Sequence, residues 1–129
     1  MTLATSIRKA ARSLVTTFGN DVSLYTYSSA TKAENDEGDI TVSDWGTAST
    51  VKVVDGVNIK EALVNMGAGM ESVGEDDKIA RDDVTIAVND RMTVDSVEYR
   101  VVELVPMNVQ TTLIVQTVKV ARVTSTTTW

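Results

Sequence analysis

The stretch that decides the fold is DRMTVDSVEYRVVELV, residues 90–105. Two runs rich in β-branched and apolar residues, 91–94 and 99–105, flank the dipeptide Asp95-Ser96. Asp and Ser are residues that favour tight turns, and two such runs joined by a tight turn are typical of an antiparallel hairpin. The stretch therefore predicts a hairpin in the C-terminal third of the chain.

The second run of this hairpin has two adjacent valines, Val101 and Val102, at its middle. Successive side chains of a strand point to opposite faces, so at least one of the two valines must lie in the core. Val101 shares its face with Tyr99, and we expect Val101 to be buried against Leu113 or Val115.

Beyond the hairpin, residues 106–108 predict a further turn and residues 111–123 a long strand. Both faces of that strand are partly apolar, so we expect it to be central or covered on both sides. Residues 124–129 are five Ser/Thr residues closed by Trp129 and are expected to form a flexible tail. Two interpretations of Trp129 stay open: an incidental frayed end, or an anchor in a partner, since Trp is enriched in interface hot spots.

Towards the N-terminus the β texture continues as short segments. Alternating or β-branched residues predict strands at 22–27, 40–42, 49–54 and 84–88, and a short strand near Ile79. The pattern changes before residue 20, where apolar residues recur with helical spacing at Leu3, Ile7, Ala10, Ala11, Leu14 and Phe18.

The N-terminal helix is expected to span residues 1–19 and to stop at Gly19, because glycine accepts the left-handed conformation that follows many helices. Its three bases, Arg8, Lys9 and Arg12, fall largely away from the apolar stripe and are candidate helix contacts. The stripe does not decide whether the helix packs on its own domain or on a neighbouring subunit.

Together these segments predict a mainly β fold: a small antiparallel β-barrel or sandwich with an N-terminal α-helix and long polar loops. We expect a single domain over 1–129. It comprises the helix (1–19), a β domain (20–123) and the flexible C-terminal tail (124–129).

The first polar loop, residues 28–39, has no hydrophobic period and is predicted to be a mobile loop or a long hairpin tip. Four acids surround Gly38: Glu34, Asp36, Glu37 and Asp39. An EF-hand with Gly38 at its sixth position would have Ala33 at its first, where a ligand is required. An acidic hairpin tip, acting as an assembly loop, is therefore favoured over a calcium site.

A second polar region surrounds an ambiguous segment, residues 58–70, which fits either a short helix or a loop broken by Gly67 and Gly69. Residues 71–83 hold six acids and are expected to form a second loop. Adjacent carboxylates on an extended chain point apart, so these acids do not form an acid–base pair. The candidate assembly residues of this region are Gly67, Gly69, Glu75, Asp76 and Asp77.

Composition excludes several functional classes. The chain has no Cys and no His, which removes disulfides, thiolate or imidazole metal ligands and the usual neutral-pH base. No apolar run approaches the ~18 residues of a membrane span. All 18 acids lie within residues 21–103, and the net charge is −6, which disfavours nucleic-acid binding. We therefore expect no enzyme, no cofactor, no metal and no membrane partner.

The order of these parts resembles a known family. A helix runs into a first strand at residues 18–25, an acidic loop follows, KEAL at 60–63 precedes a glycine-containing loop, and residues 90–102 resemble a "D-x-hydrophobic, D-G-x-x-Y-x-V" hairpin with Ser96 at the usual glycine. A strand ending in VARV at 120–123 closes the chain. Over residues 18–123 this resembles the head-closure, or head–tail connector, proteins of tailed bacteriophages.

The resemblance implies a small β-barrel or sandwich whose copies form a six- or twelve-fold ring at the neck of the virion. The ring would contact a portal or adaptor protein and tail proteins, and DNA would pass nearby without sequence-specific binding. A tail-completion or tail-terminator ring protein and a small non-viral β-barrel binding module remain alternatives.

Overall fold

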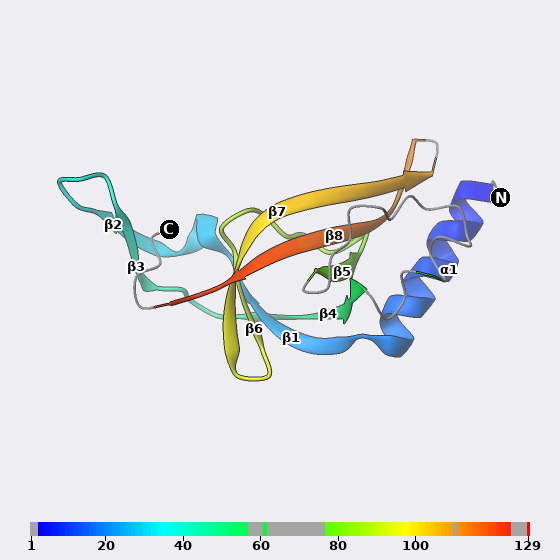
Figure 1. The fold of residues 1–129 in the computed structure, drawn as a ribbon, viewed down its shortest axis with the longest axis horizontal. Helices are drawn as coiled ribbons and strands as arrows, with labels where there is room; N and C mark the ends of the chain where they lie inside the picture. Colours follow the sequence, from blue (N-terminus) through cyan, green and yellow to red (C-terminus); the bar gives the residue numbers. More distant parts are fainter. Residues whose placement is uncertain (1–2, 57–60, 62–76, 110, 125–128) are drawn as a thin grey trace.

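The structure, a computed structural model, describes residues 3–56, 61, 77–109, 111–124 and 129 (Figure 1). The described elements are α1 (Leu3–Phe18), β1 (Asn20–Tyr25), the 3-10 turn η1 (Tyr27–Ser29), β2 (Thr31–Glu34), β3 (Ile40–Asp44), β4 (Ser49–Asp55), β5 (Lys78–Arg81), β6 (Arg91–Val94), β7 (Val97–Val109) and β8 (Thr112–Arg122). Six strands form a closed antiparallel barrel in the order β1-β4-β5-β8-β7-β6, and β6 pairs with β1 to close it. The mainly β prediction is confirmed, and the barrel holds rather than the sandwich.

The predicted hairpin is present as β6 and β7, which pair from Arg91 opposite Arg100 to Val94 opposite Val97. Its turn residues both have positive φ, 49° at Asp95 and 67° at Ser96. Positive φ at both central positions is the type I′ pattern, whose twist matches that of the strands it joins. Ser96 therefore adopts the backbone conformation for which a glycine is usual.

Val101 is fully buried, as predicted, but its neighbours differ from the prediction. It pairs with Val120 of β8 and packs in a cluster that includes Met92 and Val118. Val115, one of the two expected neighbours of Val101, instead lies opposite Met107. The long β7–β8 register, which includes an irregularity between Val101 and Glu103, causes this difference.

The turn predicted at 106–108 is wrong, because β7 continues through Pro106 to Val109. Pro106 lies opposite Gln116, in the part of β7 that pairs with β8 alone after β6 has ended. A strand with one neighbour tolerates proline, since the missing N–H can lie on the unpaired edge.

The strand predicted at 84–88 is also wrong, although the segment does contribute to the core. These residues lie between turns, and Ile86 is buried. The backbone joins β7 just afterwards, where Asn89 N–H donates to Val101 O (2.8 Å) and Val101 N–H donates to Asp90 O (2.9 Å). The alternation of apolar and polar residues at 84–88 therefore reflects the burial of the Ile86 side chain and not the hydrogen-bond ladder of a strand.

In the described part of the chain, the core consists of two clusters on opposite faces of the same strands. Val53 and Ala80 belong to one cluster, while their chain neighbours Val54 and Ile79 belong to the other. The second cluster includes residues of α1, so β4 and β5 are covered on both faces. Strand β8 contributes to both clusters as well, through Val115 and Val118, which agrees with the expectation of a covered strand.

Helix α1 packs on its own barrel, but its buried face differs from the predicted stripe. The buried residues are Ala4, Ile7, Ala11 and Val15, whereas Ala10 is exposed and Leu3 and Phe18 are 71% and 59% exposed.

No helix in the described part of the chain has the length and apolarity needed to cross a bilayer.

Gly19 ends α1 for a reason other than the expected left-handed φ. Its N–H donates to Val15 O at 2.8 Å, and its φ is not positive. A Cβ at this position would lie 2.3 Å from Val15 O and 3.2 Å from Val53 O. Glycine is therefore required mainly because a Cβ would clash with the carbonyl of Val15 in the last turn of α1, and the approach of β4 tightens the position further.

Candidate functional site

Strands β2 and β3 form a two-stranded sheet separate from the barrel, which we call the arm (residues 31–44). It projects at one end of the long axis, and α1 lies at the opposite end (Figure 1). Its ladder runs from Thr31 opposite Asp44 to Glu34 opposite Ile40, with an irregularity after Thr31, and every residue from 31 to 39 is exposed. The region predicted as a mobile loop or long hairpin tip is thus a hairpin that belongs to neither core cluster.

The tip of the arm is a defined turn organised by Asn35. The Asn35 side-chain Oδ1 accepts hydrogen bonds from the N–H groups of Glu37 (3.0 Å) and Asp39 (2.8 Å), and Gly38 has a φ of 86°. An Asx turn of this kind holds the backbone and leaves the carboxylates at the surface. Among the described residues, no group of three or more acids is placed to hold a metal ion.

The base of the arm is a cluster of aromatic rings: Tyr25, Tyr27, Trp45 and Trp129. The Trp45 centroid lies 6.4 Å from Tyr25, 6.3 Å from Tyr27 and 4.8 Å from Trp129. Both tryptophans of the chain and two of its three tyrosines are therefore gathered here. Edge-on and tilted pairs at these separations are favourable aromatic geometries.

Cations line the same cluster and tie it to the barrel. Arg91 lies 5.5 Å from the Tyr25 ring and 5.8 Å from the Trp45 ring, and Lys32 lies 4.7 Å from the Tyr27 ring. These are cation–π distances. We define the aromatic base as the four rings with these two cations.

Trp129 contacts its own chain at this base. The backbone N–H of Trp129 donates to Ile40 O (3.1 Å), and Tyr27 Oη donates to the backbone oxygen of Trp129 (3.3 Å). Residues 125–128 lie outside the described part, so the flexible-tail prediction is not tested there. From the sequence, Trp129 was identified as a candidate contact residue, but Trp45 was not. The pair Tyr25 and Tyr27, at the end of a predicted strand, was the sequence feature that could have indicated an aromatic surface here.

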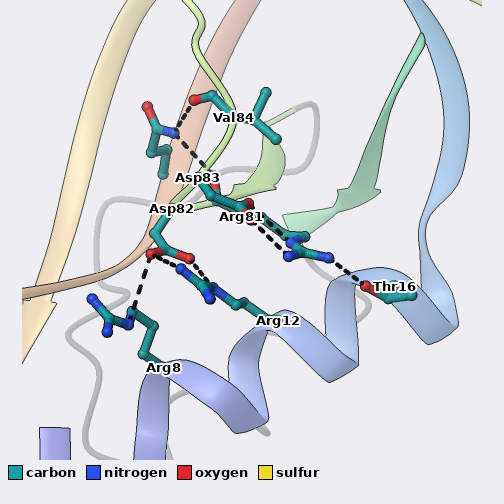
Figure 2. Close-up of polar contacts among 8 residues, drawn as sticks. Arg8, Arg12, Thr16, Arg81, Asp82, Asp83 and Val84 are labelled. Atoms are coloured by element: carbon teal, nitrogen blue, oxygen red, sulfur yellow. Dashed lines mark hydrogen bonds and ion pairs between the residues drawn. The ribbon is translucent and has the colours of Figure 1, made fainter. Parts of the chain in front are cut away.

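A second polar cluster joins α1 to the turn after β5 (Figure 2). Arg12 donates from Nε (2.7 Å) and Nη2 (2.8 Å) to the two carboxylate oxygens of Asp82, and Arg8 Nε lies 3.8 Å from the same carboxylate. The Asp82 side chain is only 7% exposed. The hydrogen bonds to Asp82 raise the pKa of Arg12 above its ordinary value, against a smaller opposing effect of burial.

The neighbouring carboxylate, Asp83, has a different partner. Arg81 donates to both of its oxygens and also reaches Thr16 Oγ1 at 3.2 Å. The hydrogen bonds from Arg81 lower the pKa of Asp83 below its ordinary value. Gln116 of β8 fixes this turn because its side-chain amide donates to the carbonyls of Arg81 and Val84.

The candidate helix contacts therefore divide into two kinds. Arg8 and Arg12 share one carboxylate, and Lys9 is exposed on the helix. Among the residues that the structure describes, these three cations face the single carboxylate of Asp82, while Asp83 is paired with Arg81. The described part of this surface therefore has an excess of positive charge, and we call it the basic face (Arg8, Lys9 and Arg12). It lies at the end of the molecule opposite the arm (Figure 1).

The remaining sequence candidates are only partly described. Asp77 is buried, and its carboxylate accepts from Lys119 Nζ at 2.7 Å, so it forms a partly buried ion pair with β8. Gly67, Gly69, Glu75 and Asp76, and the helix-or-loop question for residues 58–70, lie outside the described residues.

Comparison with known proteins gives no relatives: no protein-family model, curated protein or solved structure matches this chain.

Proposed function

We propose that the chain is a structural protein that forms a ring at the head–tail joint of a tailed phage, closing the head below the portal and connecting it to the tail. The observation that carries the proposal is the arm. A hairpin with an exposed acidic tip, outside both core clusters, adds little to the stability of one copy. Such a structure is well suited to contacts between copies or with neighbouring proteins.

The charge distribution supports the same role. The chain carries a net charge of −6, with all of its acids between residues 21 and 103. Protein affinity for DNA comes largely from cations that neutralise phosphates. A protein with this net negative charge can border a channel through which DNA passes without retaining it.

Two alternatives come from other positions or classes. A tail-completion or tail-terminator ring would have the same surfaces and differ in its place in the particle. A small non-viral β-barrel binding module would have no ring at all. Formation of a ring would exclude the binding module. The position of the ring in the particle would then distinguish the head–tail joint protein from the tail-completion or tail-terminator protein.

The experiment replaces the five residues of the arm tip, 35–39, by Asn-Gly, which keeps Glu34 opposite Ile40 and forms a two-residue hairpin turn. We expect unjoined heads and tails to accumulate in particle preparations, while thermal unfolding of the purified chain is unchanged. The matched control places Asn-Gly in the other hairpin turn, at Asp95-Ser96, and should leave joining intact. Normal joining by the tip variant would contradict the proposed role of the arm.

A further inference from the structure

We infer that neighbouring copies meet head to tail, with the acidic arm tip of one copy docked on the basic face of α1 of the next. This inference deepens the proposed function and, for a closed ring, rests on it. It commits to one occupant of the basic face, a second copy of this chain.

Charge complementarity is the first argument. The arm tip has Asp36, Glu37 and Asp39 within five residues, and Glu34 precedes them. The basic face has three cations, and among the described residues Asp82 supplies a single carboxylate for two of them. Each surface therefore has an unbalanced charge of opposite sign, which favours their encounter and sets their orientation.

The placement of the two surfaces is the second argument. The arm and α1 lie at opposite ends of the long axis, so the arm of one copy cannot reach the helix of the same copy (Figure 1). The complementary surface must come from another copy. A contact between two different surfaces of identical chains is heterologous, and repetition of it gives a closed ring or an open filament.

The order within the arm is the third argument. The Asn35 turn fixes the tip, and the aromatic base holds the other end of the arm against the barrel. Docking therefore requires less ordering of backbone and side chains than docking of a flexible loop would. The direction of the arm is set before the neighbour arrives.

The test uses the absence of cysteine from the chain. Ala33→Cys places one thiol beside the acidic tip, and Ser13→Cys places another one helical turn after Lys9; both positions are exposed and every charge is kept. Equal amounts of the two variants, one with a size tag, are mixed and oxidised. We expect mixed dimers well above the one half that random pairing gives.

The control pairs Ala33→Cys with Ala121→Cys, an exposed position on β8, and should give mixed dimers no more often than random pairing. We expect the excess to disappear in about 1 M salt, where the screening length is ~3 Å. Random pairing for the arm and helix variants, or an equal excess for the control, overturns the head-to-tail contact.

The outcomes also separate this inference from the proposed function. Rings seen by electron microscopy without the selective mixed dimer would keep the ring and reject this contact. Selective mixed dimers from a chain that assembles only into open filaments would keep the contact and reject the ring.

Discussion

Thr117 is a buried polar residue whose hydroxyl has no partner among the described residues. The residue is fully buried on β8, and in the described part of the chain its Oγ1 neither accepts nor donates a hydrogen bond. Burying an unpaired polar group costs about 1–3 kcal/mol, so Thr117→Val, which keeps the shape, should raise the free energy of unfolding by about 1 kcal/mol. Urea unfolding measures this. Thr112→Val, at a half-buried position of the same strand, is the control and should change stability less; a destabilised Thr117→Val would contradict the assignment.

Val101 and Val102 provide a matched pair for testing the β7 register. Val101 is fully buried, and its neighbour Val102 is 38% exposed. Val101→Asp would bury an unpaired carboxylate and should cost several kcal/mol of a total that is ~5–15 kcal/mol for small domains. Val102→Asp should cost about 1 kcal/mol or less. Equal urea midpoints for the two variants would show that the strand register is wrong.

At this scale the sequence identified burial better than contacts. Val101 was assigned to the core from alternation alone, because alternation depends only on its own strand. Its partners depend on the β7–β8 register over many residues, including the irregularity after Val101. At Gly19 the end of the helix was predicted but its cause was not: the position requires glycine because a Cβ would lie 2.3 Å from Val15 O, and not because of a left-handed φ.

Among the elements, α1 is attached to the barrel by apolar packing and by the Asp82 contacts. Asp82→Asn leaves Arg12 and Arg8 without their shared carboxylate and should cost about 1.5–3 kcal/mol, the range for hydrogen bonds to charged groups. Asp83→Asn removes a more exposed pair, 43% exposed at the carboxylate, and should cost about 0–1 kcal/mol. Urea unfolding at neutral pH compares them, and a larger loss for Asp83→Asn would contradict this ranking.

The Asp83 contribution should also depend on pH. Its pKa is lowered in the folded chain by Arg81, so the folded state binds this proton less readily than the unfolded state. The contribution is therefore present above the ordinary value of 3.8 and is lost as the pH falls through the lower folded value. The difference in unfolding free energy between the wild-type chain and Asp83→Asn should shrink on acidification below that value. If this difference in unfolding free energy grew on acidification, the pKa of Asp83 would be raised in the folded chain, which contradicts the account.

Local elements were more predictable than those set by distant partners. The β6–β7 hairpin, the short strand at Ile79 and the N-terminal helix each carry a signal within their own residues. The predicted strand at 84–88 failed because Ile86 is buried without a ladder, and the turn at 106–108 failed because β8 continues to pair past Pro106. The arm was anticipated as an exposed acidic segment, but its aromatic base joins residues as distant as Tyr27 and Trp129.

The whole molecule is a closed barrel with an acidic arm at one end and a basic helix at the other (Figure 1). Closure depends on the pairing of β1 with β6 and of β5 with β8, which join segments far apart in the sequence. The uneven distribution of charge along the chain is visible in the sequence. That the acidic arm and the basic helix lie at opposite ends of the molecule could be seen only in the structure. That opposition underlies the proposal that copies assemble into a ring.

The most direct test of the ring proposal is a cryo-electron microscopy map of the neck of tailed particles that contain this chain. The account predicts a six- or twelve-fold collar of these barrels between head and tail, with the arm of each copy reaching α1 of the next. Absence of the chain from the neck, or its presence only on the capsid surface or along the tail, would contradict the account.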